Sequence, residues 1–317
     1  MPNDNKIQKF LQKLAPCIEL GELDGCVGEA ARLAQEMSLG AKELLNLSAE
    51  EGENGKYCFT YVIALAAAQS FEGKAKSRAY SNAGFAAQHL KKVEKAEKYH
   101  KKAIETDPNH AGFHNNYADF LREESKFLDA EKEVRIALQI QPNYSYALGT
   151  YGDILANEDY LKEAIEKYHE AIKYSDSMAY KAKAEIHNNL GWAYANLGQY
   201  NRAKKKFEEA HKLDPQNVKV IRNIRALGKV KSEPKISKMQ WSIAIALFAG
   251  VTATWYLFLT KKLTENIFSA QTVILIAIII FILFYHQLGK FKAGPIEFEK
   301  STEHRSQPLD TISKFER

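Results

Sequence analysis

The sequence predicts an all-α protein in which a solenoid of helix-turn-helix repeats is followed by a transmembrane helical hairpin. Two observations support this prediction. Small residues and prolines recur at intervals of 34 residues in the first part of the 317-residue chain, and such an interval is the signature of stacked helical repeats. Residues 1–238 are rich in charged side chains, whereas residues 239–286 are mostly apolar. The chain is therefore a repeat domain joined to a membrane segment.

The repeat is clearest between residues 77 and 215. The step from Gly152 to Gly191 is 39 residues, so five residues are inserted before the last unit, where Asp176 stands in place of an expected proline. We predict four units, at about 77–110, 111–144, 145–183 and 184–217. The pairs 34 residues apart are Pro108 and Pro142, Ala96 and Ala130, Ala103 and Ala137, and Ala130 and Ala164.

Each unit is expected to form two antiparallel helices. In the last unit, the first helix spans about residues 184–197 and the second about 201–213, with Gly198 ending the first. Gly191 and Ala203 are expected where the two helices cross, because a larger side chain there would separate the backbones. Pro215 then ends the second helix.

This register resembles the tetratricopeptide repeat (TPR) family. The resemblance rests on Leu190-Gly191-x-x-Tyr194, Ala203-x-x-x-Phe207, Ala210 and Pro215, and it covers residues 77–215. It implies an α-solenoid whose first helices line a concave groove that binds partner proteins. The chain departs from the family at the large aromatic position near the start of each first helix, which here holds Tyr80, His114, Leu148 and His187.

The segments on either side of the four units have less regular spacing. Residues 1–76 show helical periodicity and are expected to form three or four helices, either degenerate repeats or an N-terminal cap. Residues 216–238 are predicted to contain a capping helix and a basic juxtamembrane linker. The capping helix has one apolar face, formed by Val218, Ile221, Ile224 and Leu227.

Two uncharged runs predict the membrane hairpin. Residues 239–260 and 267–286 are each long enough to cross a hydrocarbon layer of about 30 Å, and residues 261–266 form a short loop between them. Trp241, Trp255, Tyr256 and Tyr285 lie near the ends of the runs, as membrane interfaces favour. Residues 287–317 form a tail that is expected to be partly disordered, and the segment KFKAGPIEFEK within it has no assigned role.

The distribution of basic residues predicts the orientation of the hairpin. Seven lysines and arginines lie in residues 219–238, two in the loop and four in residues 287–306. Both termini of this integral membrane protein are therefore expected in the cytoplasm, in keeping with the lack of an apolar signal sequence at the N-terminus. The basic residues before the first span are candidates for contact with lipid headgroups: Lys219, Arg222, Arg225, Lys229, Lys231, Lys235 and Lys238.

No motif for catalysis, cofactor binding or metal binding was found. The chain lacks phosphate-binding and hydrolase motifs, and His110 and His114 have no third ligand nearby in the sequence. Cys17, Cys26 and Cys58 are expected to be reduced and to serve packing. A net charge of +5 with interleaved Lys and Glu argues against nucleic-acid binding. We expect no enzyme activity, cofactor or metal.

The resemblance to TPR proteins implies where a partner binds. One inner position of the four first helices holds Asn82, Asn116, Thr150 and Asn189, and an asparagine amide can donate to and accept from a peptide main chain. It is left open whether these amides bind a partner or only cap and solvate the groove. The acidic residues favour a neutral or basic segment, with aromatic anchors. The predicted groove comprises Asn82, Phe85, Asn115, Asn116, Asp119, Tyr146, Asp153, Asn188, Asn189, Trp192 and Asn196.

The sequence thus favours a membrane-anchored TPR scaffold or adaptor that binds partner proteins through the groove on the cytoplasmic face. The alternative is a TPR-regulated, membrane-active oligomer that forms a pore or remodels the bilayer with its hairpin. Gly250, with Ala246 and Ala253, offers small residues for helix contact, so a homo-oligomer remains open. No ionisable residue lies in either span, which disfavours a transporter.

Overall fold

The computed structural model describes residues 2–231 and, within the first predicted span, residues 249–250, 252–253, 255–256 and 259–260. These residues contain α-helix and no strand, as predicted. None of the described helices has both the length and the apolar content that a membrane crossing requires. The second predicted span, the loop before it and the segment KFKAGPIEFEK lie outside the described residues.

The chain divides into two compact units, of which the first contains α1 to α12 and the second contains α13. The helices are α1 (Pro2–Glu19), α2 (Leu23–Glu36), α3 (Ala41–Glu53), α4 (Tyr57–Ser70), α5 (Gly73–His89), α6 (Val93–Thr106), α7 (Ala111–Glu123), α8 (Phe127–Ile140), α9 (Ser145–Asn157), α10 (Leu161–Lys173), α11 (Tyr180–Asn196), α12 (Tyr200–Leu213) and α13 (Val218–Lys231).

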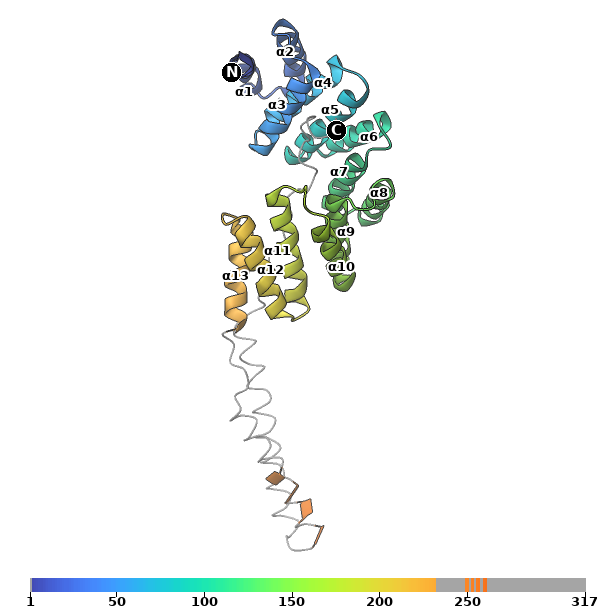
Figure 1. Cartoon of the computed structure of the whole chain (residues 1–317), viewed down its shortest axis with the longest axis vertical. Helices are drawn as coiled ribbons and strands as arrows, with labels where there is room; N and C mark the ends of the chain where they lie inside the picture. The colour runs from blue at the N-terminus through green and yellow to red at the C-terminus, as the bar shows by residue number, and fades with distance from the viewer. Residues whose placement is uncertain (1, 232–248, 251, 254, 257–258, 261–317) are drawn as a thin grey trace. The chain divides into compact units, whose positions relative to one another are not determined.

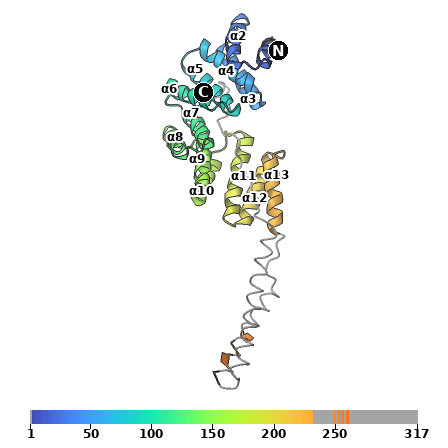
Figure 2. The same ribbon diagram turned by 180° about the vertical axis from the view of Figure 1, so that it is seen from behind.

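Helices α5 to α12 of the first unit form four helical hairpins in succession. We call α5, α7, α9 and α11 the A helices, and α6, α8, α10 and α12 the B helices. Each A helix packs on the B helix that follows it and also on the neighbouring A helix (Figure 1). The same order of stacking is visible from behind (Figure 2). This arrangement confirms the predicted α-solenoid, because each hairpin buries its apolar face against the next one.

The A and B helices of a hairpin touch at a glycine. A Cβ atom added to Gly191 would lie 2.7 Å from Cδ1 of the Phe207 ring. The aromatic ring of Phe207, rather than Ala203, therefore requires a glycine at this position. Two further hairpins repeat the contact: an added Cβ would lie 2.9 Å from Nδ1 of His100 at Gly84 and 2.6 Å from Cε1 of Tyr168 at Gly152.

Each turn from an A helix to its B helix contains one residue with positive φ. In the first three hairpins this residue is not a glycine: it is Lys91 (φ 58°), Ser125 (φ 58°) and Asp159 (φ 67°). In the last hairpin it is Gly198 (φ 72°). The following amide closes the turn by donating to a carbonyl five residues earlier, which is a Schellman motif. The donor and acceptor pairs are Lys92 and Ala87 (2.9 Å), Lys126 and Leu121 (2.8 Å), Tyr160 and Leu155 (2.9 Å), and Gln199 and Tyr194 (2.8 Å).

The predicted insertion lies between α10 and α11. Most of it extends α11 at its N-terminus, so this helix has 17 residues, compared with 13 in α7 and in α9. The backbone N–H of Ala179 donates a hydrogen bond of 3.1 Å to the hydroxyl oxygen of Tyr146. The side chain of Tyr146 on α9 therefore anchors the longer connection to α11.

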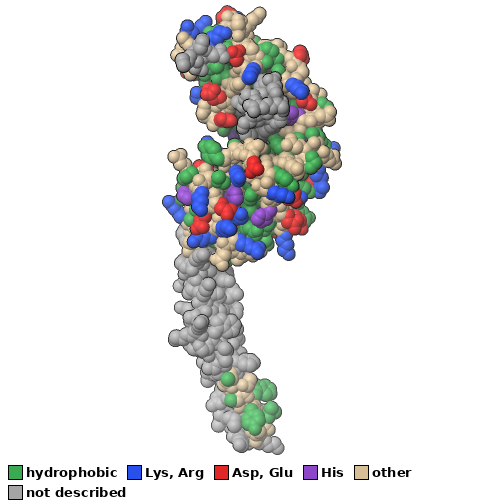
Figure 3. All heavy atoms as spheres, viewed as in Figure 1, with side chains coloured by type: hydrophobic (Ala, Val, Ile, Leu, Met, Phe, Trp, Pro, Cys, Tyr) green, Lys and Arg blue, Asp and Glu red, His purple; other side chains and the backbone are tan. Residues whose placement is uncertain are grey.

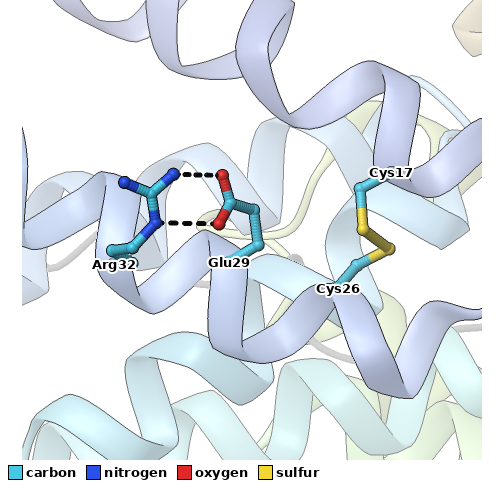
Figure 4. Close-up of a disulfide and its surroundings, with 4 residues drawn as sticks. All are labelled: Cys17, Cys26, Glu29 and Arg32. Atoms are coloured by element: carbon cyan, nitrogen blue, oxygen red, sulfur yellow. Dashed lines mark hydrogen bonds and ion pairs between the residues drawn. A yellow bond between two sulfur atoms is a disulfide. The ribbon is translucent and has the colours of Figure 1, made fainter.

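Residues before α5 form α1 to α4, and α3 packs on α4. Cys17 on α1 and Cys26 on α2 form a disulfide (Figure 4), so the prediction that all three cysteines are reduced is wrong for this pair. Cys58 is a free, half-buried cysteine. Close to the disulfide, Arg32 donates to Glu29 from Nε (2.9 Å) and Nη2 (2.6 Å). The disulfide thus links the first two helices of the chain.

Helix α13 belongs to the second unit. Its buried residues include Val220, Asn223 and Leu227, whereas Val218 is 57% exposed. The apolar face predicted from Val218, Ile221, Ile224 and Leu227 is therefore wrong at its first position. The proposed role of this helix as a cap stays a prediction.

Candidate partner-binding surface

The residues of the predicted groove come from all four A helices, and we refer to them as the inner-face residues. Most are buried or half-buried, and Asn196 is exposed. They are Asn82 and Phe85 on α5, Asn115, Asn116 and Asp119 on α7, Tyr146 and Asp153 on α9, and Asn188, Asn189, Trp192 and Asn196 on α11.

Two inner-face asparagines bond to the preceding helix of the stack. The amide Nδ2 of Asn116 on α7 donates to Oγ of Ser81 on α5 at 3.1 Å. In the same way, Nδ2 of Asn82 on α5 donates to Oγ of Ser48 on α3 at 2.8 Å. Because α3 makes the same contact as an A helix, it extends the stack by one more layer. One function of these amides is therefore to join neighbouring layers.

Asp153 joins three helices. Its Oδ1 atom accepts a hydrogen bond of 2.6 Å from the hydroxyl of Tyr168 on α10 and one of 2.8 Å from Nδ2 of Asn189 on α11. Asn188 in turn donates from Nδ2 to Oδ1 of Asn189 at 3.3 Å. Asp153 thus fixes its own hairpin and the next A helix at the same point.

The contact between α7 and α9 lacks a bond of this kind. Thr150 occupies the position of Asn116, and Asn115 occupies the position of Ser81. Both side chains are 0% exposed, and the Thr150 hydroxyl and both amide atoms of Asn115 have no hydrogen-bond partner in the described part of the chain. A buried polar group in this state costs about 1–3 kcal/mol.

Charged side chains are also buried on the inner face. Arg122 donates to Oδ1 of Asp119 from Nε (3.0 Å) and Nη2 (2.7 Å). Burial opposes the charge on Arg122, yet its pKa is raised, because Asp119 and Asp153 stabilise the guanidinium ion. The side chains of Asp119 and Arg122 are 2% and 4% exposed, so this ion pair is held away from water.

Two aromatic inner-face residues, Phe85 and Trp192, lie on the first and last A helices, and the third, Tyr146, lies on α9. Phe85 packs against His89, with ring centroids 4.5 Å apart, and His89 stacks on Tyr57 at 4.0 Å. Trp192 on α11 is half-buried, and its carbonyl accepts a hydrogen bond of 2.9 Å from Nδ2 of Asn196. Phe85 and Trp192 therefore lie on the A helices on either side of α7 and α9.

The structure thus places most of the predicted groove residues on adjacent helices, and their role in partner binding stays a prediction. Sequence reasoning missed the acceptors Ser48 and Ser81. The signal for them was available, since Ser48 and Asn82 are 34 residues apart and Ser81 and Asn116 are 35 apart. A polar residue one repeat earlier is the natural partner of a buried amide.

The predicted lipid contacts fall partly on α13. Arg222 and Arg225 are exposed and Lys219 is half-buried, whereas Lys235 and Lys238 lie outside the described residues. On the face of the molecule that Figure 3 shows, basic and acidic side chains are interspersed.

A pocket of about 440 Å³ lies between α6, α7 and α8, and none of the inner-face residues lines it. Its walls are mainly charged, and the other lining residues are Ile104, Tyr117 and Leu121. No three His, Cys, Asp or Glu side chains are close enough to hold a metal ion in the described ranges.

Comparison with known proteins supports the repeat assignment. Residues 77–110 and residues 184–217 each match a family model described as a tetratricopeptide repeat. No curated protein matches the sequence. The chain therefore contains tetratricopeptide repeats, and it is a scaffold of the kind that mediates protein–protein interactions.

Solved structures share this fold at low sequence identity. One is the crystal structure of TTC0263, a thermophilic TPR protein in Thermus thermophilus, with 15% identity and a TM-score of 0.51 over 59% of this chain and 98% of that one. Another is the crystal structure of the APC/C hetero-tetramer Cut9–Hcn1, with 14% identity and a TM-score of 0.52 over 63% of this chain and 39% of that one. The similarity concerns the solenoid fold.

Proposed function

We propose that this chain, which contains tetratricopeptide repeats, is a membrane-anchored scaffold that binds partner proteins through the inner-face residues of its A helices. The observation that carries the proposal is the row of polar and charged side chains along α5, α7, α9 and α11. Such side chains are costly in a helix contact that serves packing alone. Their presence on four successive helices favours recognition of another protein.

The charge of this surface supports a neutral or basic partner segment. The acidic residues Asp119, Asp153 and Glu185 lie on α7, α9 and α11 and are at most 5% exposed. Arg122 on α7 forms an ion pair with Asp119.

The predicted spans support the membrane anchor. Within residues 239–260, the described Trp255, Tyr256 and Leu259 are 49%, 67% and 70% exposed, which suits side chains that face lipid. The hydroxyl of Thr252 donates to the carbonyl of Ala249 at 2.9 Å. A hydroxyl that bonds to its own helix is compatible with a hydrocarbon environment.

Two features bear on which side of the membrane the repeats face. The excess of lysine and arginine beside the spans favours the cytoplasm. Disulfides, such as the one between Cys17 and Cys26, persist mainly in oxidising compartments. We propose the cytoplasmic side on the basis of the charge bias. This assignment is tested by adding protease to sealed vesicles whose cytoplasmic face points outward, where the repeats should be cleaved. Protection of the repeats from the protease would place them on the opposite side of the membrane.

Co-purification from mild detergent tests the binding function. We expect the double variant Asp119→Asn and Glu185→Gln of the full chain to lose partners that the wild type retains. The matched control is the double variant Asp129→Asn and Glu208→Gln, which removes two exposed carboxylates from B helices. This control should retain the partners that the wild type binds and the first double variant loses. If all three proteins bring down the same partners, the inner-face residues are not the binding surface.

Reconstitution tests the anchor. The full chain should remain with the membrane after extraction at high pH, and vesicles that contain it should stay sealed. Release by extraction would contradict the membrane anchor. Dye leakage from the vesicles would instead favour a membrane-active oligomer that the repeats regulate.

A further inference from the structure

The pocket between α6, α7 and α8 is a second concave site in the repeats, separate from the inner-face residues. Two B helices and one A helix contribute its walls. Its volume of about 440 Å³ falls in the lower part of the range of about 300–1,000 Å³ that is usual for ligand pockets. The pocket therefore has room for one long side chain or a small molecule.

The ring of Tyr117 forms an aromatic wall of this pocket. Tyr117 is 8% exposed, and its hydroxyl donates weakly to Oε1 of Glu97, at 3.5 Å. In the described part of the chain, no lysine or arginine lies over the Tyr117 ring. The face of an aromatic ring attracts a cation within about 6 Å of its centre, so this ring can accept one.

The next hairpin shows how a cation occupies the equivalent place. Tyr151 lies 34 positions after Tyr117, and Cζ of Arg135 lies 5.2 Å from the centre of the Tyr151 ring. Arg135 donates to Oε1 of Glu131 from Nε (3.0 Å) and Nη2 (2.7 Å), and the Tyr151 hydroxyl donates to the same oxygen at 3.0 Å. A tyrosine and a glutamate thus hold a guanidinium group between them.

The side chain that corresponds to Arg135 does not cover Tyr117. It is Lys101, 34 positions earlier, and its Nζ donates to Oε1 of Glu97 at 2.7 Å. Nζ of Lys126 donates to the other oxygen of the same carboxylate at 3.2 Å. Both amines are therefore held at Glu97, and the aromatic ring faces a pocket that the chain does not fill with a cation of its own.

The remaining charges of the pocket favour a cation. A second cation beside the Tyr151 ring, Lys167 at 6.0 Å, corresponds to the carboxylate Glu133 in the pocket. The lining contains four acidic and three basic residues, for a net charge of −1. Two of its carboxylates, Glu105 and Asp129, are exposed and have no ion pair within the described ranges, against one such lysine, Lys132.

We propose that this pocket binds an arginine side chain of a partner protein, with its guanidinium group over the ring of Tyr117 and within reach of Glu105 and Asp129. The apolar stem of the arginine packs against Ile104 and Leu121, as the stems of long charged side chains do on apolar surfaces. This goes beyond the scaffold function proposed above, because it gives the repeats a second binding site that includes none of the inner-face residues.

The chemistry of the pocket favours an arginine within a polypeptide. Free arginine carries an α-carboxylate, which the negative walls repel, whereas this group is a neutral amide within a chain. A lysine ammonium group is more strongly hydrated and lacks the planar fork that stacks on a ring and pairs with carboxylates. The expected order of affinity is therefore arginine in a peptide, then lysine in a peptide, then free arginine.

A short peptide, acetyl-Gly-Arg-Gly-amide, tests the proposal with the full chain in mild detergent. A titration followed by saturation-transfer NMR should show binding through the arginine side chain. Citrulline in place of the arginine keeps the shape and removes the charge, so it should weaken binding about fivefold or more. No binding of the arginine peptide, equal binding of the citrulline peptide or tighter binding of free arginine would overturn the proposal.

Variants of the full chain locate the site. Tyr117→Leu, which copies Leu190 at the equivalent position of the last hairpin, should weaken binding of the arginine peptide about fivefold. Lys101→Arg should also weaken it, because the new guanidinium can cover the ring as in the next hairpin. Glu163→Gln, an exposed carboxylate at the position equivalent to Asp129, is the control and should bind normally. If either of the first two variants bound the peptide as the wild type does, the proposal would fall.

The two proposals can fail separately. If the peptide does not bind but co-purified partners still depend on Asp119 and Glu185, the scaffold function stands and the pocket proposal is wrong. If the peptide binds as expected but no partner depends on these two residues, the pocket proposal stands and the inner-face residues are not the binding surface. Partners that are lost from Tyr117→Leu or Asp129→Asn alone belong to the pocket.

Discussion

The ring of Tyr168 lies against the backbone of Gly152, so that a methyl group added to Gly152 would be 2.6 Å from Cε1 of the ring. Carbon atoms in favourable contact are about 3.5–4.0 Å apart. The equivalent positions in the second hairpin are Ala118 and Val134, both of which are fully buried. A glycine thus accompanies a ring, and an alanine accompanies a smaller aliphatic side chain.

We expect Gly152→Ala to destabilise the protein. Alanine in a helix is favoured over glycine by about 1 kcal/mol, but overpacking a rigid core costs about 1–3 kcal/mol. Tyr168 is 0% exposed and its hydroxyl bonds to Asp153, so the ring has little freedom to move away. The clash should therefore outweigh the helix preference, and the midpoint of thermal unfolding should fall.

The double variant Gly152→Ala and Tyr168→Val tests the cause, because it recreates the pairing of Ala118 with Val134. The loss in free energy of unfolding of the double variant should be smaller, by about 1 kcal/mol, than the sum of the losses of the two single variants. Strictly additive effects in urea unfolding would mean that the two side chains do not compete for the same space.

We expect Lys91→Gly to stabilise the protein. Lys91 is an exposed residue with a φ of 58°, and this left-handed conformation costs a residue with a side chain about 1–2 kcal/mol. Glycine avoids that cost but loses about 0.5–1 kcal/mol of chain entropy on folding. The net gain should be about 0.5 kcal/mol, measured by chemical unfolding. Gly198→Ala (φ 72°) should lose stability, and a gain from that variant would contradict the argument.

His114 should make the stability depend on pH. Nε2 bonds to the carbonyl of Pro108 at 2.9 Å and Nδ1 to Oε2 of Glu133 at 2.7 Å, so both ring nitrogens face acceptors and both must carry hydrogen. Burial opposes the charge, yet the pKa of His114 is raised above 6.5 because Glu133 and Pro108 stabilise the imidazolium ion. The resulting stability is fully present below pH 6.5 and is lost as the pH rises through the folded-state pKa. The free energy of unfolding of Glu133→Gln should not show this loss as the pH rises. If its dependence on pH were the same as that of the wild type, the assignment to His114 would be contradicted.

His187 occupies the same repeat position and should behave in the opposite way. Burial and the nearby Lys206 lower its pKa to about 4, although Glu209 lies 3.0 Å from Nδ1. A lowered pKa gives stability that is present above pH 6.5 and is lost as the pH falls toward about 4. His187→Leu, which copies Leu148 at the equivalent position, should abolish that loss. Persistence of the loss in this variant would assign it to another group.

Reduction should destabilise the N-terminal helices. The Cys17–Cys26 bond closes a short loop, because the two cysteines are nine positions apart in the sequence, and a loop of this size contributes about 2–3 kcal/mol in the chain-entropy view. A reducing agent should therefore lower the unfolding midpoint of the wild type. Cys17→Ser should unfold alike with and without the agent, and Cys58→Ser should still respond to it. A response in Cys17→Ser would show that the disulfide is not the cause.

Much of the solenoid could be predicted because small residues recur at a fixed interval. The detail of each helix contact could not be predicted in the same way. Ala203 and Phe207 are four residues apart on one helix and share a face, so the sequence does not decide which of them meets Gly191. The turns at Lys91 and Ser125 were missed because their positive φ values come from hydrogen bonding and not from glycine.

The sequence located the inner-face residues but not their bonds. Asn82 and Asn116 were placed on the correct helices by the repeat register. Their bonds to Ser48 and Ser81 depend on how closely adjacent layers approach, which spacing does not measure. The disulfide was missed for a related reason, since the positions of Cys17 and Cys26 do not reveal that the chain reverses between them.

Because each glycine is matched to the ring of its own hairpin, a helix from one hairpin cannot replace the equivalent helix of another without a loss of stability. Repeat genes lose and gain units by recombination between similar segments. A crossover that joined the helix of Ala118 to the helix of Tyr168 would force a methyl group against the ring, and the reciprocal product would leave Gly152 facing the smaller Val134 across a void. Both products would fold less stably, so selection should favour exchange of whole hairpins over exchange of half hairpins.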